Sequence, residues 1–230
     1  MNFLQSDGLV QTTGILVIRS QGKVAITDNI VTMGPGDPGA YPLGIYAGGD
    51  PEARYLISLN TIVTLHPNAD RIDIIANITE TTAERAVVIA NHVTMQSVIS
   101  TAGGLVFQGA ERDSLMSANR VEGTSGNALQ ILGIDSTLMA DSNLALANDI
   151  SQLSPLNGDI YLGANSTHNL VVGKCSTYID LGTDNRVLCG SPLGPVSDGS
   201  AKAANRAPAM FGAYGDAIRK VRLDAITNRQ

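Results

Sequence analysis

The chain repeats one short phrase along its length: an apolar strand, a polar turn, a second apolar strand and a marker residue. The phrase ends at Asn29, Asn60, Asn91, Asn119 and Asn143, and at Lys174 in a sixth copy. Successive markers are separated by 31, 31, 28, 24 and 31 residues. Self-similarity at a period of this length is typical of a solenoid, in which each repeat packs against its neighbours along one axis.

Each copy predicts three short strands, the third following directly after the marker. The first strands alternate between apolar and other residues, as in residues 43–46, 72–75 and 105–108. Because successive side chains of a strand point to opposite faces, this alternation gives one buried and one outward face. The residues that we expect to point inward are Ile45, Ile57, Ile74, Val88, Phe107, Met116, Ile131, Met139, Leu162 and Val172.

Three strands per repeat, with no helix-period segment between them, resemble the right-handed parallel β-helix. Pectate lyases, polygalacturonases, polysaccharide epimerases and phage tailspikes share this fold. The resemblance covers residues 14–190 and implies an all-β, right-handed solenoid of about six to seven coils. We interpret the recurring asparagine as a structural ladder, because asparagine tolerates a left-handed bend and its amide can bond to the next coil.

The pattern stops after Gly190, which predicts three parts of the chain. Residues 1–190 form the β-helix, residues 191–209 are a linker rich in Pro, Gly, Ser and Ala, and residues 210–230 form a partly helical C-terminal segment. Tyr214, Ile218, Val221 and Ala225 would lie on one stripe of that helix. We expect this segment to cap the last coil, with docking on a neighbouring subunit as the alternative.

The composition limits the classes of partner that the chain could bind. The net charge is −6 and no run of Lys or Arg occurs, which argues against nucleic-acid binding. No apolar stretch reaches the length of a membrane span, and no signal-peptide pattern is visible at the N-terminus. The resemblance implies an extracellular, cell-surface or virion protein. Cys175 and Cys189 leave open whether they are bridged.

In the enzymes that this fold resembles, the site lies on the outward face of the first sheet. The candidate binding residues there are Tyr46, Asp73, Gln108, Gln130, Asp159 and Tyr161. Asp73 and Asp159 would be three coils apart, or about 14 Å. Paired carboxylates of glycosidases lie within about 10 Å, so these two do not form such a pair.

A second constellation lies in the turn before the second strand. The candidate catalytic residues there are Arg54, Glu84, Arg85, Glu111, Arg112 and Asp113. On successive coils they would form a ridge of alternating charge. One interpretation is a site where arginines neutralise an acidic sugar and carboxylates hold Ca²⁺. The other, which we favour, is a solvated row of ion pairs.

Motifs for a metal site or another cofactor are absent from the sequence, and it contains no tryptophan. We therefore expect a non-catalytic structural or carbohydrate-recognition solenoid. If it has a polysaccharide partner, we expect that polymer to be acidic or neutral. The alternative is a polysaccharide lyase or epimerase. Ile75, Val106 and Leu132 put apolar side chains on the outward first sheet, which predicts a homo-oligomer, a trimer by resemblance to tailspikes, or cover by the C-terminal segment.

Overall fold

The computed structural model describes residues 2–6, 13–20, 22–34, 43–49, 53–65, 70–76, 85–97, 102–109, 112–132 and 139–190. These residues form an all-β solenoid of stacked parallel coils and include no helix. The chain divides into two units, residues 1–196 and 197–230. The predicted linker and C-terminal segment lie outside the described residues.

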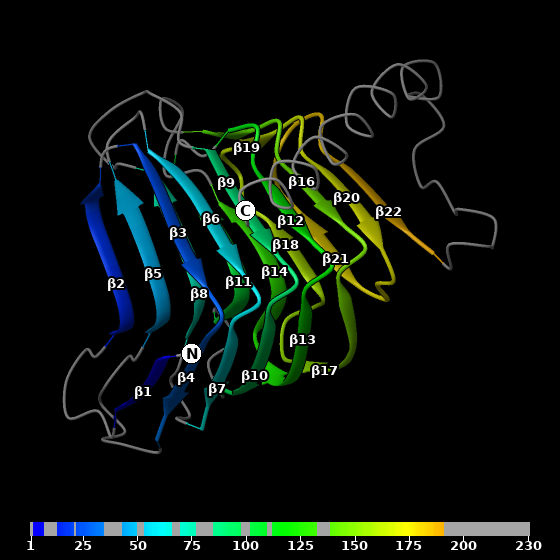
Figure 1. Cartoon of the computed structure of the whole chain (residues 1–230). Helices are drawn as coiled ribbons and strands as arrows, with labels where there is room; N and C mark the ends of the chain where they lie inside the picture. The colour runs from blue at the N-terminus through cyan, green and yellow to red at the C-terminus, as the bar shows by residue number, and fades with distance from the viewer. Residues whose placement is uncertain are drawn as a thin grey trace. The chain divides into compact units, whose positions relative to one another are not determined.

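Three parallel sheets, A, B and C, run along the solenoid (Figure 1). The first strand of each coil belongs to sheet B, the second to sheet C and the third to sheet A, which confirms the predicted order of three strands per coil. Sheet B contains β2 (Thr13–Ser20), β5 (Leu43–Gly49), β8 (Asp70–Ala76), β11 (Gly103–Gln108), β14 (Asn127–Leu132), β18 (Ile160–Leu162) and β21 (Tyr178–Asp180).

Sheets C and A follow the same stacking order. Sheet C contains β3 (Lys23–Thr27), β6 (Arg54–Ser58), β9 (Arg85–Ile89), β12 (Leu115–Ser117), β16 (Leu144–Leu146), β20 (Leu170–Gly173) and β22 (Arg186–Cys189). Sheet A contains β1 (Asn2–Ser6), β4 (Asn29–Met33), β7 (Thr61–Thr64), β10 (His92–Gln96), β13 (Arg120–Ser125) and β17 (Asp149–Pro155). A short pair, β15 (Ala140–Asp141) and β19 (Ser166–Thr167), lies at a corner before sheet C.

The core fills the inside of the coils mainly with aliphatic side chains and methionines, together with Tyr55 and Phe107. Phe107, Ile131 and Leu162 stack in register on sheet B and are fully buried. On sheet C the inward residue lies three positions before the marker, as Ile57 does before Asn60 and Val88 before Asn91.

Two of the predicted inward positions are wrong. In the sixth coil Val171 is buried and Val172 points outward, because the position three before Lys174 is Val171. Met139 is half-buried and precedes β15 instead of lying on a core strand. The side chain of Ile74 lies outside the described residues, and the other seven residues are buried.

An asparagine ladder occupies the corner between sheets C and A. Its members are Asn29, Asn60, Asn91, Asn119 and Asn148. At each step the side-chain Nδ2 and the backbone N–H of one asparagine donate to Oδ1 of the next, and the Nδ2–Oδ1 distance is 2.9 Å at all four steps. The second Nδ2 hydrogen reaches a backbone carbonyl, as from Asn91 to Ile57 at 2.9 Å. Each inner amide is therefore buried with both donors and its acceptor satisfied.

The predicted fifth member, Asn143, belongs to a different corner. Asn148 takes its place in the ladder. The register of β16 and β20 puts Lys174, the marker of the next coil, at the position that follows Asn148 in the stack. Asn143 lies before sheet C, where its Oδ1 accepts from the backbone N–H of Ser114 at 3.1 Å. Asn169 and Asn185 continue this second ladder.

The left-handed residue at these corners is the one before the asparagine, not the asparagine itself. The residues with positive φ include Asp28, Leu59, Ala90, Ala118 and Ala147 at the first ladder, and Ser142, His168 and Asp184 at the second. Leucine and alanine are disfavoured there by about 1–2 kcal/mol. The hydrogen bonds of the following asparagine side chain hold the corner in this shape. The ladder thus stabilises a backbone bend that the residue before each asparagine disfavours.

We predict that Asn91→Ala lowers the free energy of unfolding by about 3 kcal/mol. The substitution leaves the backbone and side-chain donors of Asn60 without their acceptor. It also removes the side-chain donor to the Ile57 carbonyl and one of the two donors to Asn119 Oδ1, all in a buried corner. Denaturant unfolding followed by circular dichroism measures the change. Asn157→Ala is the matched control, because Asn157 is exposed in a turn and should change stability by less than about 0.5 kcal/mol. Equal effects of the two substitutions would contradict a stabilising ladder.

Candidate functional site

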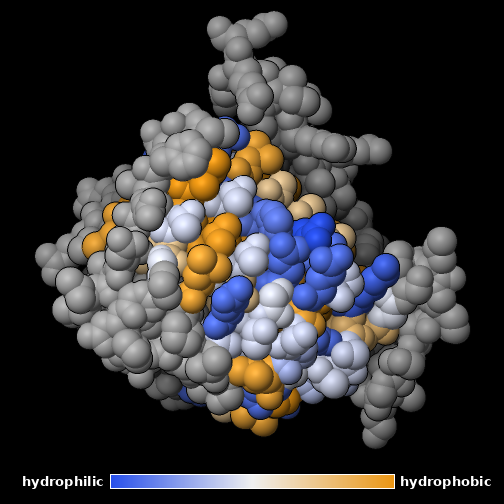
Figure 2. All heavy atoms as spheres, turned by 90° about the horizontal axis from the view of Figure 1, so that it is seen from below, coloured by the Kyte–Doolittle hydropathy of each residue, from blue (hydrophilic) through white to orange (hydrophobic). Residues whose placement is uncertain are grey.

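The outward face of sheet A carries the most concentrated polar cluster among the described residues. Two neighbouring rows cross β10, β13 and β17, with a register shift in β17 between the two rows. One row contains His92, Arg120 and Asp149, and the other contains Thr94, Glu122 and Gln152. Figure 2 shows this face from below, with hydrophilic side chains gathered over its later strands.

Glu122 is the centre of this sheet A cluster. Its carboxylate lies 2.7 Å from an Arg120 guanidinium nitrogen, and it accepts a hydrogen bond from the Thr94 hydroxyl at 3.2 Å. His92 Nε2 lies 2.9 Å from Glu122 Oε1, a close polar contact that lacks the alignment of a hydrogen bond. His92 and Arg120 together hold the pKa of the Glu122 carboxyl below its ordinary value.

The cluster is connected further along the sheet. Arg120 donates to the side-chain oxygen of Gln152 at 2.8 Å, which joins β13 to β17. Asp149 accepts from the hydroxyl and the backbone N–H of Ser151, and these bonds lower the pKa of Asp149, with a smaller contribution from the positive charges of Arg120 and Lys174. These contacts connect side chains of β10, β13 and β17 in one network on the outward face of sheet A.

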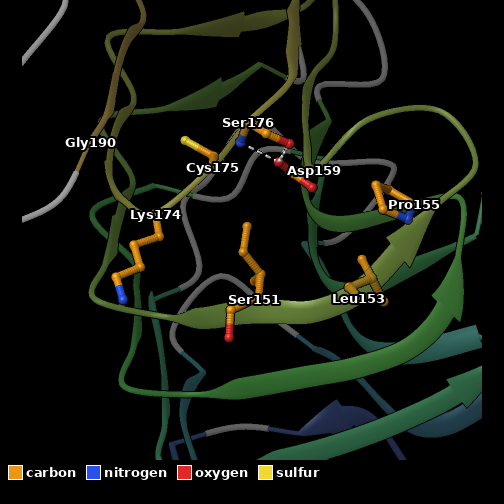
Figure 3. A pocket seen from close by; sticks show the side chains of 9 residues that line it. Ser151, Leu153, Pro155, Asp159, Lys174, Cys175, Ser176 and Gly190 are labelled. Carbon is orange, nitrogen blue, oxygen red and sulfur yellow. Dashed lines mark hydrogen bonds between the residues drawn. The ribbon is translucent and has the colours of Figure 1, made fainter.

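A hollow of about 460 Å³ lies beside β17 at the end of sheet A (Figure 3). It exists because the last coil passes from β20 to β21 without adding a strand to sheet A. Buried apolar side chains of β17 line one side, and polar side chains line the other. The lining residues are Ile150, Ser151, Leu153, Pro155, Asp159, Lys174, Cys175, Ser176 and Gly190.

Asp159, which was predicted to face a ligand, instead joins two coils. It is buried, and one carboxylate oxygen accepts hydrogen bonds from the backbone N–H groups of Ser176 and Thr177 and from the Ser176 hydroxyl (Figure 3). Asp159 does not share a row of sheet B with Gln130, because the residue in register with Gln130 is Tyr161, two residues further along the chain. The Oδ2 atom of Asp159 is therefore used to join two coils within the solenoid.

The structure brings four other predicted binding residues into one row of sheet B. Tyr46 is in register with Asp73, and Gln130 with Tyr161, with Val106 between the two pairs. Val106 and Gln130 are buried, with only 1% and 3% of their surface exposed. Gln130 donates to Asn127 Oδ1 at 3.1 Å. The middle of this row is therefore closed to a ligand.

Gln108 lies in the neighbouring row, in register with Ile75 and Leu132. The expected apolar column of Ile75, Val106 and Leu132 is thus wrong in its register, because Val106 belongs to the row of Asp73 and Gln130. Leu132 is half-buried and Val106 fully buried. The side chains of Asp73 and Ile75 lie outside the described residues.

Only part of the predicted charged ridge forms one row. Arg54 and Arg85 are in register, with Lys23 before them. The next position is held by Asp113, which lies 3.2 Å from Arg85. Arg112 is one residue out of the row, and its backbone forms an isolated parallel β-bridge with Asp141. Glu84 and Glu111 lie outside the described residues. The row is cationic at one end, and both side chains of the Arg85–Asp113 ion pair are exposed.

Cys175 and Cys189 form a disulfide that ties the exit of β20 to the end of β22. In the part of the chain that the structure describes, no group of three metal-ligating side chains comes together, and no helix is long and apolar enough to cross a membrane. No family model, curated protein or solved structure matches this chain.

The sheet A cluster was not among the predicted sites, although its signal is present in the sequence. The segments HVTMQ and RVEGT follow a marker asparagine and alternate between buried and polar residues. This pattern places His92, Thr94, Arg120 and Glu122 on one outward face. The resemblance to enzymes with sites on the first sheet directed the prediction to sheet B instead.

We predict that the Glu122 cluster makes stability depend on acid pH. Because the folded pKa of Glu122 lies below its ordinary value of 4.5, the carboxylate stabilises the fold above that value, and this contribution is lost as the pH falls through the folded pKa. Unfolding midpoints of the wild type and Glu122→Gln, measured between about pH 7 and pH 3, should therefore converge toward the acid end.

His92→Gln is the companion variant, because it removes the largest cause of the lowered pKa and keeps a polar side chain on the same strand. Its stability should also vary less with acid pH than that of the wild type. A constant difference between wild type and Glu122→Gln over the whole range would contradict the charge pairing at this cluster.

Proposed function

We propose that this chain is a non-catalytic recognition solenoid that binds a neutral polysaccharide along the outward face of sheet A. The observation that carries the proposal is the double row of hydrogen-bonding side chains on β10, β13 and β17. Neighbouring strands lie about 4.8 Å apart, close to the length of one sugar unit in an extended chain. A row of polar side chains at this spacing matches a ligand with repeated hydroxyl groups.

The charges of the cluster favour a neutral ligand over an acidic one. Arg120 is occupied by Glu122 and Gln152, and Glu122 also pairs with His92. Little uncompensated positive charge therefore remains for a carboxylate or sulfate, and the net charge of −6 repels polyanions. Because the side chains are already bonded to one another, binding a polysaccharide would cost little additional side-chain conformational entropy.

Two further features belong to this proposal. The Cys175–Cys189 disulfide supports a location outside the reducing cytosol, such as a cell surface, a secreted protein or a virion. We also propose that the coil is right-handed, because crossovers between parallel strands of one sheet are right-handed in nearly all proteins.

The alternative is a polysaccharide lyase or epimerase that acts on an acidic glycan with the Arg54 and Arg85 row. The geometry of this arginine row is less favourable for catalysis, since Arg85 contacts Asp113 and Arg112 lies outside the row. Formation of the unsaturated product from uronic-acid polymers, lost in Arg85→Ala, would favour this alternative.

A screen of immobilised neutral and acidic polysaccharides by affinity electrophoresis tests the proposed function. We predict that a neutral polymer retards the protein, and that Arg120→Ala and Gln152→Ala each weaken binding about tenfold or more, because each removes a hydrogen-bonding group from the double row. Arg186→Ala on sheet C is the matched control and should bind like the wild type.

Two results would contradict the proposal. One is binding to none of the neutral polymers while the protein is folded. The other is wild-type affinity in both Arg120→Ala and Gln152→Ala, which would place any glycan contact on another face.

A further inference from the structure

The last coil of the solenoid, formed by β21 and β22, adds little to the hydrophobic core. None of residues 176–190 is buried, and Val187 is the one apolar side chain among them that packs, half-buried, against the core. The coil before it buries Ile160, Leu162 and Val171 almost completely. The last coil also stacks on a neighbour from one side only, so apolar packing holds it less firmly than it holds the inner coils.

The first asparagine ladder does not reach the last coil. Its final member is Asn148, and the next two positions in the stack hold Lys174 and Gly190. The second of these positions follows from the register of β20 and β22, in which Gly173 pairs with Cys189. Lysine and glycine have no side-chain amide that could both donate and accept between coils. The corner between sheets C and A therefore lacks ladder bonds at its last two levels.

The Cys175–Cys189 disulfide lies at this same corner. Cys175 directly follows Lys174, and Cys189 directly precedes Gly190. The bond joins the two levels that a further ladder step would join. Because the cysteines are separated by 14 positions, the bond also closes a covalent ring that contains β21 and β22. Such a ring stabilises an ordered segment by restricting the freedom of its open form.

The other attachments of the last coil are hydrogen bonds. At the second ladder, the backbone N–H and Nδ2 of Asn169 donate to Asn185 Oδ1 at 3.0 and 2.9 Å. Backbone bonds include those from Arg186 to Asn169 at 2.8 Å and from Gly190 to Gly173 at 3.1 Å. Hydrogen bonds that replace bonds to water contribute little net free energy. With so little apolar burial, they offset the conformational entropy of this coil nearly alone once the disulfide is removed.

We propose that the Cys175–Cys189 disulfide is a redox-sensitive clasp, whose reduction in the folded protein releases residues 178–190 from the coil before them. The reductant is a dithiol. One of its thiolates attacks a protein sulfur and forms a mixed disulfide, and its second thiol then displaces the other sulfur. The dithiol ends as its own disulfide, and the protein gains two electrons and two protons as two thiols. Both cysteines are half-buried, and Cys175 lines the hollow in Figure 3, so the bond is not sealed in the core.

The release is confined to the last coil. Asp159 Oδ2 accepts hydrogen bonds from the backbone N–H groups of Ser176 and Thr177, which hold the chain just after Cys175. Beyond this point, opening leaves the outer edges of β18 and β20 without their neighbours and removes Gly190 from the wall of the hollow. Unpaired strand edges are sites where another strand can add. Reduction thus converts a closed end of the solenoid into an open one, whether or not sheet A binds a glycan.

Hydrogen exchange of the full chain, followed by mass spectrometry without denaturant, tests the proposal. On reduction with dithiothreitol, we expect the backbone amides of β21 and β22 to exchange about a hundredfold faster. The amides of β6 to β13 should keep their protection, because those coils retain neighbours on both sides. Reoxidation should restore the slow exchange of the last coil.

The double variant Cys175→Ser with Cys189→Ser is the matched control. It should show the fast exchange of β21 and β22 without any reductant, and dithiothreitol should not change it further. Since the chain has two cysteines in all, titration of free thiols gives the redox state of the clasp in every sample.

Four outcomes would overturn the proposal. Two free thiols in the protein purified under oxidising conditions would show that no clasp forms. Slow exchange of β21 and β22 in the fully reduced protein would show that the disulfide does not hold the coil. Loss of protection in all coils would make the bond a staple of the whole fold. Reduction that proceeds only in denaturant would rule out a clasp that operates in the folded protein.

Discussion

The side-chain amide of the ladder asparagine is the interaction on which the solenoid depends. Each ladder amide bonds to the next asparagine at 2.9 Å, so it joins neighbouring coils at the spacing of the strands themselves. It also fixes the corner where the chain leaves sheet C for sheet A, next to a residue held at positive φ. An amide can do this because it offers two donors and one acceptor that takes two bonds, all within one small side chain.

Once the corners are fixed, the alternation of each strand decides what every face presents. Inward positions hold mainly apolar residues in all three sheets, whereas the outward positions differ from sheet to sheet. Sheet A presents bonded polar groups, the outward positions of sheet C hold a row of mostly aliphatic residues that ends at Arg186, and the middle of sheet B is buried.

Much of this architecture follows from the sequence, because a repeated phrase constrains every copy at once. The order of the three strands and the ladder through Asn119 were predicted in this way and are confirmed. The fifth ladder member was predicted wrongly as Asn143 in place of Asn148. Both asparagines follow a residue with positive φ, Ser142 in one case and Ala147 in the other. Only the pairing of β12 with β16 decides which corner each asparagine occupies.

The candidate sites were harder to predict, because a site depends on register to within one residue. A shift of one position separates Asp113, which contacts Arg85, from Arg112, which does not. A shift of two separates the buried Asp159 from Tyr161 in the row of Gln130. Turn lengths vary between coils, so counting from the marker residue does not fix these positions.

Hydrogen exchange of the asparagine side chains in the native protein, followed by NMR, tests the central role of the ladder most directly. The Nδ2 protons of Asn60, Asn91 and Asn119 are buried and bonded on both hydrogens, and they should exchange orders of magnitude more slowly than those of the exposed Asn157. Protection should be shared by the three, because each bond depends on the next. Exchange of the ladder amides as fast as that of Asn157 in the folded protein would contradict this account.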